Sequence, residues 1–447
     1  MFTGCAMEPA PWEGRGRPDI ILVTIDSLRA DHLGAYGYSR PTSPALDALA
    51  AEGVLVRHHI AQAPYTKASM GSLFSGLFPT AHKAFTTSRH PSETMTGHVR
   101  GAVPVTDLLE PGITTLAERL AAAGYHTVGL MTNPVLLADF GFAQGFARYE
   151  FLTRSSQDFA AAADVVRQAL GAIDARPQGR PMFLWVHLME PHSPYSPPEH
   201  LVPLFPVLDP PRSMDQTVIP AWVRLGESTD LNLYLARYDA DIRSADDALG
   251  EFFQGLKARG LWDPSVVVVT ADHGEEFLDH GGMEHNLTLY DEMLRVPLIV
   301  KAPGLRPGVV DEQTQSVDLA PTLAFLAGAP TAADETQGAN IWPVLQRRGG
   351  GEPYAYAEIV GRRFALRSRQ WKLISSLQGG RQLFDLRRDP EERENLAKET
   401  PAVVAQFENT LARIVAASIK AGEHIQGQYA PIPAAVLERL RSLGYVQ

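Results

Sequence analysis

The chain has 447 residues, of which 45% are hydrophobic, and this favours one large globular domain with a smaller one attached. Its net charge of −11, without any lysine- or arginine-rich run, argues against nucleic acid as a partner, because binding a phosphate backbone needs a concentrated basic face. The single cysteine excludes an internal disulfide and a cysteine-rich metal cluster, and no apolar run reaches the roughly 20 residues that span a bilayer.

The N-terminus gives two indications about location. The first residues, MFTGCA, place a small residue before Cys5, as at a bacterial lipoprotein cleavage site, and a Pro/Gly/Glu-rich tether follows up to residue 18. This favours the bacterial envelope or periplasm. The charged and apolar regions of a signal peptide are not in the sequence, so the chain as written is expected in the cytoplasm. Both alternatives stay open.

Apolar strands alternate with amphipathic helices between residues 19 and 348. Strands are predicted over 19–25, 54–61, 125–131 and 181–188, at the valines of 266–269, and over 295–301. Helices are predicted over 43–53, from about 68, over 114–123, 158–175 and 231–258, and close to Asp318. This alternation predicts an α/β fold, with a large mixed, mostly parallel sheet sandwiched by helices as the catalytic domain.

The pattern of predicted elements changes after residue 348. Short strands are predicted over 354–359, 364–369, 371–375 and 382–385 without helices between them, followed by a helix over 401–421 and a tail over 434–443. Residues 349–447 are therefore predicted to form a C-terminal subdomain with a small antiparallel sheet. Two irregular stretches, 79–112 and 193–230, are expected to shape a substrate pocket.

Polar clusters follow the ends of several predicted strands. Asp26 follows the first strand, Asp272 and His273 follow the four valines, and His285 comes twelve residues later. Thr66 stands at a strand-to-helix turn, and His192 lies beyond the strand that contains His187. Because ligands bind at the carboxyl ends of strands in open α/β sheets, we expect these residues to converge on one site.

The residue types suggest metal-assisted ester chemistry. Asp26, Asp272 and His273 suit one divalent cation, and Thr66 is expected as a further ligand and as an alkoxide nucleophile toward phosphorus or sulfur. The helix start after Thr66 favours an anion, and either His192 or His285 is expected to protonate the leaving oxygen. The alternatives are a helix cap at Asp272 or Thr66 and an ordinary loop histidine at His273.

In the motifs around these residues, the chain resembles the sulfatase-like branch of the alkaline phosphatase superfamily, and the resemblance extends over almost its whole length. The matching segments, in the family's order, are Ile25–Gly37, Ala63–Gly76, Ala123–Thr127, Glu190–Tyr195, Ala271–Glu275, Leu294–Ile299, Asp318–Leu323 and Leu383–Leu396. The resemblance implies metal ligands at Asp26, Asp272 and His273 and a substrate-anion contact at His192. It places Thr66 where sulfatases carry the Cys or Ser that becomes formylglycine, and His285 where many relatives have a lysine.

Several positions depart from the sulfatase pattern. The stretch Thr66-Lys67-Ala68-Ser69-Met70 lacks the family's proline and arginine, and threonine cannot be converted to formylglycine. Ser27 replaces the second aspartate of the family's paired start, and Asn133 or Thr132 stands where a lysine is expected. Relatives with a threonine nucleophile are phosphodiesterases, phosphonate-processing enzymes and phosphoglycerol transferases, so the resemblance favours phosphoryl transfer without formylglycine.

Three further residues are candidate substrate contacts, each with an ordinary structural alternative. Lys67 either contacts the anion or is solvated, and Asn133 either faces the site or serves the loop before Pro134. His187 either orients the site or is a buried core histidine. Ser69 is a poorer nucleophile than Thr66, because it is expected inside the helix.

We therefore expect a hydrolase or transferase that uses one divalent ion (Mn²⁺, Ca²⁺, Mg²⁺ or Zn²⁺) and acts on phosphate esters, a diester or phosphonate monoester in preference to a sulfate ester. The expected substrate is a small anionic ester, a lipid headgroup or a glycan. The alternatives are a formylglycine-independent sulfuric ester hydrolase and an inactive sulfatase-like binding protein. The sequence has no signal for oligomeric state.

Overall fold

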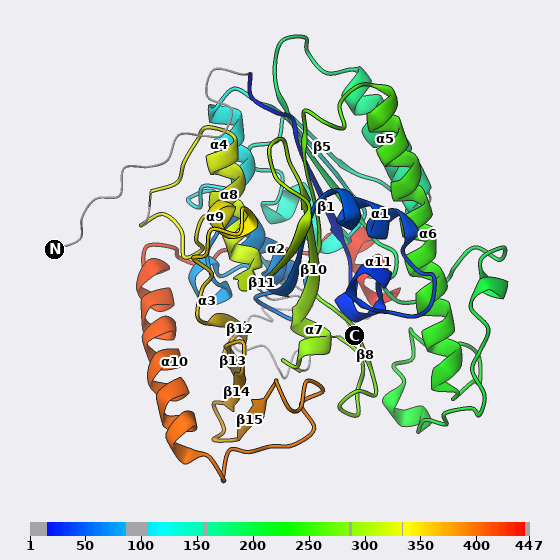
Figure 1. The fold of residues 1–447 in the computed structure, drawn as a ribbon, viewed down its shortest axis with the longest axis vertical. Helices are drawn as coiled ribbons and strands as arrows, with labels where there is room; N and C mark the ends of the chain where they lie inside the picture. Colours follow the sequence, from blue (N-terminus) through cyan, green and yellow to red (C-terminus); the bar gives the residue numbers. More distant parts are fainter. Residues whose placement is uncertain (1–15, 86–104, 155–158, 286–287, 333, 443–447) are drawn as a thin grey trace.

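A mixed eight-stranded sheet forms the centre of the molecule (Figure 1). The computed structural model describes residues 16–85, 105–154, 159–285, 288–332 and 334–442. The strands, in their order across the sheet, are β11 (Gly308–Gln315), β2 (Val54–Ile60), β10 (Arg295–Lys301), β7 (Val266–Ala271), β1 (Ile20–Ile25), β6 (Met182–Leu188), β4 (His126–Met131) and β5 (Arg148–Phe151). Only β10 runs antiparallel to its neighbours, so the sheet is mostly parallel, as predicted.

Helices cover both faces of this sheet, because the central strands are apolar on both sides. In β1, Ile20 and Leu22 belong to one hydrophobic core, whereas Ile21, Val23 and Ile25 belong to the other. This division follows from the alternation of side chains along a strand. The first core includes residues of α2 (Thr66–Ser75), α4 (Leu116–Ala122) and α8 (Leu319–Leu326), and the second those of α1 (Pro44–Glu52), α5 (Ala162–Asp174) and α6 (Leu231–Ala258).

A second, antiparallel sheet lies near the C-terminal end of the chain. Its strands are β12 (Ala355–Ile359), β13 (Arg363–Arg367), β14 (Trp371–Ser376) and β15 (Arg381–Asp385). One face packs against α10 (Pro401–Ala421), where Phe407 and Leu411 join Leu373 in a separate hydrophobic core (Figure 1). The short elements are α3 (Pro79–His82), β3 (Val105–Asp107), β8 (Glu276–Phe277), β9 (Met283–Glu284), α7 (Asp291–Leu294), α9 (Trp342–Leu345), β16 (Tyr429–Pro431) and α11 (Ala434–Ser442).

Most predicted elements form close to their predicted limits. The helix over 231–258 has the predicted bounds, and the predicted strands of the large sheet begin and end within two residues of expectation. Two edge strands were not predicted, since β5 has only four residues and β11 is rich in polar residues. Helix α2 begins at Thr66 instead of near residue 68, so the start prediction was wrong by two residues. Cys5, the first part of the tether and most of the 79–112 stretch lie outside the described residues.

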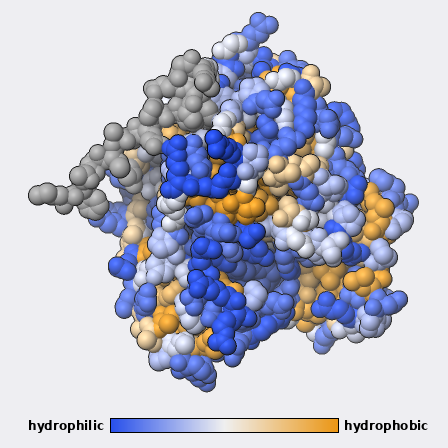
Figure 2. All heavy atoms as spheres, viewed as in Figure 1, coloured by the Kyte–Doolittle hydropathy of each residue, from blue (hydrophilic) through white to orange (hydrophobic). Residues whose placement is uncertain are grey.

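The face of the molecule shown in Figure 2 is mainly hydrophilic, with apolar residues in small groups. Among the described residues, none of the helices combines the length and apolar character needed to cross a membrane.

We expect Asp246 to make stability depend on pH. Its carboxylate accepts hydrogen bonds from the backbone N–H groups of Ala45 (2.7 Å) and Leu46 (2.8 Å) at the start of α1. Burial raises the pKa of Asp246 to about 7, although these hydrogen bonds oppose the shift. The folded state therefore binds more protons than the unfolded state between about pH 4 and pH 7, and stability falls across this range as pH rises. The melting temperature of Asp246→Asn, relative to that of wild type, should rise as the pH increases from about 4 to about 7. A difference that stays constant over this range would contradict the expectation.

A candidate active site at the carboxyl edge of the central sheet

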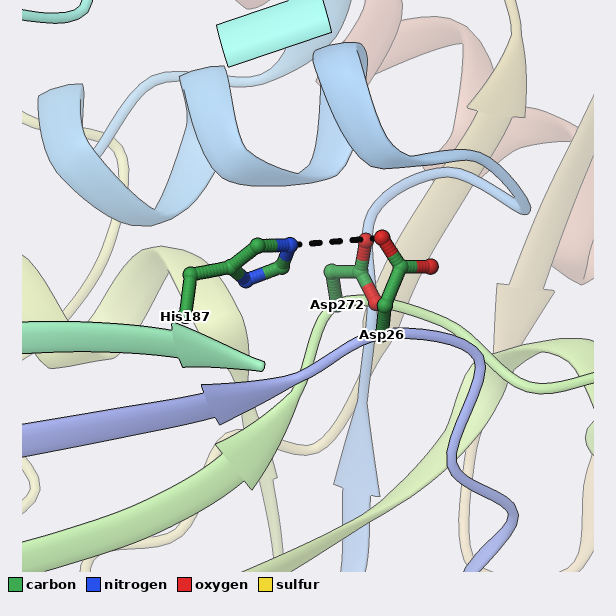
Figure 3. A group of neighbouring side chains, drawn as sticks. All are labelled: Asp26, His187 and Asp272. Carbon is green, nitrogen blue, oxygen red and sulfur yellow. Dashed lines mark hydrogen bonds and ion pairs between the residues drawn. The ribbon is translucent and has the colours of Figure 1, made fainter. Parts of the chain in front are cut away.

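The register of the three central strands brings the predicted residues together. In β1, Ile25 pairs with Leu188 of β6 on one side and with Ala271 of β7 on the other. Asp26 and Asp272 directly follow Ile25 and Ala271, so they lie side by side at the ends of neighbouring strands. His187 pairs in register with Thr24, two residues before Asp26, and therefore points to the same face of the sheet. Figure 3 shows Asp26, His187 and Asp272 pointing toward α2, which crosses above them. All three side chains are fully buried.

Thr66 is the first residue of α2 and lies next to this group. Its Oγ1 is 3.3 Å from Nε2 of His273 and 3.4 Å from Nδ2 of Asn133. Ser69 lies inside the helix, as expected, and its hydroxyl donates to the carbonyl oxygen of Asp272 (2.5 Å). This contact fixes the start of α2 against the end of β7. Thr66 is thus the hydroxyl that faces the site, and Ser69 has a structural partner.

The imidazole of His273 is oriented for ligation or proton acceptance at Nε2. Its Nδ1 lies 2.8 Å from the carbonyl oxygen of Gly274, which can only accept a hydrogen bond. Nδ1 therefore carries the proton in the neutral ring, and Nε2 presents its lone pair. That nitrogen lies 3.7 Å from Oδ1 of Asp26 and 3.5 Å from Oδ2 of Asp272.

The two carboxylates and His187 form a group suited to a cation. One ligand atom of Asp26, His187 and Asp272 lies within 4.8 Å of each of the others. Oδ2 of Asp272 is buried and receives no hydrogen bond from the described residues, so it lacks the partner that a buried carboxylate needs. Burial and the Asp26 charge raise the pKa of Asp272. A divalent cation compensates two such carboxylates, and the donor set of oxygen and imidazole fits Mn²⁺, Ca²⁺, Mg²⁺ or Zn²⁺.

His187 fits both of the roles considered for it, as a buried core histidine and as a residue of the site. Its Nδ1 lies 2.7 Å from the hydroxyl of Thr24 in the strand, as for a satisfied core histidine. Its Nε2 lies 3.2 Å from Oδ2 of Asp26, at the edge of the site. The position adds His187 to the candidate metal ligands, whereas the sequence suggested a substrate contact.

Asn133 and Ser27, which both depart from the sulfatase pattern, hold the carboxylate of Asp26 in place. Nδ2 of Asn133 donates to Oδ2 of Asp26 (2.6 Å), and its Oδ1 accepts from the backbone N–H of Val135 (2.9 Å), which fixes the amide. Ser27, in the left-handed region at φ 55°, donates from Oγ to Oδ1 of Asp26 (3.0 Å) and from N to Oδ1 of Asp272 (3.2 Å). Asn133 thus both faces the site and caps its loop, and Ser27 holds both carboxylates.

His192 and His285 lie next to His273. Their ring centroids are 4.9 Å apart, and the ring of His285 lies 4.5 Å from that of His273. Burial alone would raise the pKa of Asp26, but the charges of His192, His187 and His273 and a hydrogen bond from His187 hold it below its ordinary value. The residues predicted from four separate strand ends are therefore close neighbours.

Lys67 does not occupy the position expected of a solvated lysine. Its side chain is buried, its ammonium donates to the hydroxyl of Thr106, and it lies 4.7 Å over the ring of Phe140. Burial lowers the pKa of Lys67 to about 7, against the attraction of Asp107. The alternative of a solvated lysine was wrong, and a substrate contact by Lys67 stays a prediction.

Two residues next to His285 were not predicted to have a role. Glu275 and Tyr195 are fully buried; Oε2 of Glu275 accepts from the hydroxyl of Tyr195, and Oε1 of Glu275 lies 3.1 Å from Nδ1 of His285. Both residues fall within the quoted motifs, but their spacing along the chain does not indicate that the folded loop brings them together.

We expect Asp272→Asn to weaken metal binding by more than about 100-fold, since even loss of an outer-shell partner costs about 10- to 100-fold. Without metal the variant should be at least as stable as wild type, because it relieves the repulsion between Asp26 and Asp272. Equilibrium dialysis with Mn²⁺ and thermal unfolding in EDTA measure the two effects. Asp311→Asn, at an exposed carboxylate, is the matched control. Unchanged Mn²⁺ affinity would contradict the metal assignment.

The site therefore consists of buried carboxylates, imidazoles and a hydroxyl at the carboxyl edge of a mostly parallel sheet, in an α/β fold. The family model described as Sulfatase matches residues 18–329, and a model described as N-sulphoglucosamine sulphohydrolase, C-terminal, matches residues 279–417. The chain belongs to the sulfatase family, and the proteins it resembles are hydrolases that act on ester bonds.

Known relatives include both sulfatases and phosphonate hydrolases. The choline-sulfatase of Rhizobium meliloti is 24% identical over 462 residues, covering 89% of this chain and 86% of the relative. A protein solved in complex with its substrate D-glucosamine-2-N,6-O-disulfate superposes with a TM-score of 0.76 at 19% identity, covering 92% of this chain and 99% of that one. The phosphonate monoester hydrolase of Agrobacterium radiobacter gives a TM-score of 0.72 at 20% identity, covering 90% and 96%. The structural likenesses establish the fold.

Proposed function

We propose that this chain is a divalent-metal-dependent hydrolase or transferase of phosphate esters, acting on a diester or a phosphonate monoester in preference to a sulfate ester. The observation that carries the proposal is the position of the Thr66 hydroxyl, 3.3 Å from Nε2 of His273 and beside Asp26 and Asp272. A threonine at this place supplies an oxygen nucleophile directly, since it cannot become formylglycine.

The residues present would hold one cation through Asp26, Asp272 and His273, with Thr66 and His187 as further donors. When bound, the cation would supply the positive charge that lowers the pKa of the Thr66 hydroxyl and polarises the ester oxygens. The buried carboxylates, of which Asp272 has an oxygen without a hydrogen-bond donor, support this assignment.

The remaining residues bind and orient the ester. The N-terminus of α2 presents backbone N–H groups and the positive end of the helix dipole next to Thr66, which favours an anionic group. Asn133 holds its amide between Asp26 and Thr66 and so keeps the nucleophile in place. His192 and His285 provide imidazoles that can contact the phosphoryl oxygens and hold a proton for the leaving oxygen. A covalent Thr66 ester is then cleaved by water.

The test is hydrolysis of four chromogenic 4-nitrophenyl esters by purified protein. They are a phosphate monoester, a phosphate diester, a phosphonate monoester and a sulfate monoester, each with Mn²⁺, Zn²⁺, Ca²⁺ or EDTA. Metal-dependent turnover of the diester or the phosphonate, exceeding that of the sulfate, is expected. A preference for the sulfate would overturn the phosphate assignment, and no turnover with any metal would favour a binding role.

Sulfate ester hydrolysis is the second candidate function. The family model and the choline-sulfatase favour it, because both carry that activity in their names. Such an enzyme would act without formylglycine, through Thr66 itself. The sulfate arm of the same experiment separates it from the first proposal.

A further inference from the structure

A groove with a volume of about 1070 Å³ is lined by the C-terminal sheet and by the segment that follows His285. Thr288 and Tyr290 come from that segment. Most of the other lining residues belong to 359–363, around the turn from β12 to β13, and to 374–382, around the turn from β14 to β15. The function proposed above gives this groove no role.

The two turns of the small sheet hold each other in place. The backbone N–H of Arg362 donates to the carbonyl oxygen of Ile359 (2.9 Å), and Gly361 between them has a φ of 66°, in the left-handed region. The carbonyl oxygen of Arg362 accepts from the backbone N–H of Leu377 (3.0 Å), in the second turn. The wall of the groove is therefore built from hydrogen-bonded turns, and the backbone of Arg362 is fixed in it.

This wall stands next to the candidate active site. Strands β2 and β7 both run antiparallel to β10, so the carboxyl end of β2 lies at the same edge of the large sheet as Asp272. Gln62 follows β2, four residues before Thr66, and its carbonyl oxygen accepts from the backbone N–H of Glu358 (2.9 Å). The end of β12 is thereby attached to the segment that leads to Thr66, and the turn that contains Arg362 comes directly after it.

The charges of two arginines reach both parts of this region. Burial raises the pKa of Tyr65, and the charge of Arg362 opposes this shift. Tyr65 is the N-cap residue of α2, directly before Thr66. Burial likewise raises the pKa of Tyr290, and the charge of Arg363 opposes it. Arg362 therefore acts toward the nucleophile, and Arg363 toward Tyr290, within one groove.

The groove is positively charged, although the whole chain has a net charge of −11. Arg362, Arg363 and Arg381 line it, and the described residues of its lining include no carboxylate. Arg381 forms an ion pair with Glu408, which compensates its charge. Arg362 and Arg363 are exposed at the turn from β12 to β13. An anion that approaches this acidic protein therefore meets a local positive charge here.

His280 also lines the groove, but both of its ring nitrogens are engaged. Nδ1 lies 2.7 Å from Oε1 of Glu292, and Nε2 lies 3.1 Å from the carbonyl oxygen of Glu392. The ring stacks on that of Tyr290, with centroids 3.5 Å apart. His280 thus shapes the wall of the groove, and the arginines supply the donors for an anion.

A guanidinium group offers planar, paired N–H donors that match the oxygens of a carboxylate, phosphoryl or sulfuryl group. We propose that Arg362 and Arg363 bind a second anionic group of the substrate, so that the preferred substrate is an ester whose remaining part carries a carboxylate, phosphoryl or sulfuryl group. This rests on the proposed function of Thr66, which assigns the reacting ester to the metal side. An anionic sugar and a lipid headgroup are the two carriers of such a group.

The test compares ligands with one and with two phosphate groups. Isothermal titration calorimetry, with Mn²⁺ present, measures the affinities of hexyl phosphate and of the terminal bisphosphates of propanediol, hexanediol and nonanediol. Several lengths are needed, because two linked groups bind together only when the linker spans both sites. We expect at least one bisphosphate to bind wild type about 10- to 100-fold more tightly than hexyl phosphate, on the scale of added hydrogen bonds to a charged group.

The double variant Arg362→Gln/Arg363→Gln should bind hexyl phosphate nearly as wild type does, but its preference for the bisphosphate should fall below about threefold. Arg57→Gln, at an exposed arginine paired with Asp311, is the matched control and should keep the preference. Equal affinities of wild type for hexyl phosphate and for every bisphosphate would overturn the proposal. A preference that persists in the double variant would overturn it as well.

Two soluble ligands separate the sources of the second group. Glucose 1,6-bisphosphate presents it on a sugar, and dihexanoyl phosphatidylinositol 4-phosphate presents it on a lipid headgroup. At least one of them should bind about 10-fold more weakly to the double variant than to wild type, and equal binding of both ligands to the two proteins would contradict the subsite. The phosphate assignment at Thr66 fails or stands separately, because it is read from turnover of the chromogenic esters, whereas the groove is read from binding.

Discussion

Thr66→Ala should abolish turnover while leaving the fold and the ligands Asp26, Asp272 and His273 in place. Removing an attacking nucleophile costs roughly 10⁴- to 10⁶-fold in kcat. Loss of a single hydroxyl and methyl at the first residue of α2 leaves the contact between Ser69 and Asp272 intact, so the helix start keeps its position. Steady-state kinetics on the best ester, with metal content measured on the same preparation, tests this expectation.

Thr66→Ser is the matched control, since it keeps the oxygen and removes only the methyl group. It should retain turnover well above that of Thr66→Ala. Equal inactivity of both variants with normal metal content would show that more than the hydroxyl is needed. Retained turnover in Thr66→Ala would exclude Thr66 as the nucleophile.

Asp291→Asn should destabilise the protein by about 3–5 kcal/mol, the usual cost of leaving a buried charge without its partner. Asp291 accepts from Nη2 of Arg367 (2.8 Å) and from Nζ of Lys372 (2.9 Å), at the contact between α7 and the C-terminal sheet. Lys372 is fully buried, and its remaining carboxylate partner is Glu392 at 2.9 Å. Removing the Asp291 charge therefore leaves two cations with one carboxylate.

This loss should depend on pH in a defined direction. Burial opposes ionisation of Asp291, but Arg367 and Lys372 hold its pKa well below the ordinary value. A lowered folded-state pKa stabilises the protein fully above about pH 4 and progressively less below it. Guanidinium-induced unfolding at pH 7 and at lower pH should show the difference from wild type shrinking as pH falls. Asp311→Asn, in an exposed pair with Arg57, should cost less than about 1 kcal/mol; a similarly small loss for Asp291→Asn would contradict the expectation.

The fold could be predicted because the central strands carry their own signal. Four consecutive valines in β7 and the run IILVTI in β1 are buried on both faces, and such runs are typical of parallel strands between helices. The edge strand β11 gives no such signal, because its polar residues suit an exposed edge. The start of α2 was misplaced because Tyr65, its N-cap residue, offers no side-chain cap.

The site could be predicted where a residue immediately follows a strand. Asp26, Asp272 and His273 are fixed by the strands that end before them, and parallel register makes them neighbours. His187 lies inside an apolar strand, so only the register with Thr24 reveals that its Nε2 reaches Asp26. Glu275 was missed because its partners, Tyr195 and His285, are 80 and 10 residues away and meet only in the folded loop.

The measurement that tests the central claim most directly is mass spectrometry of the acid-quenched protein during turnover of a slowly hydrolysed phosphonate monoester with Mn²⁺. The account predicts a phosphonyl adduct on the peptide containing Thr66, present in wild type and missing in Thr66→Ala. Turnover with no adduct detected in the first turnovers would contradict the claim that Thr66 is the covalent nucleophile. An adduct on another residue would contradict it as well.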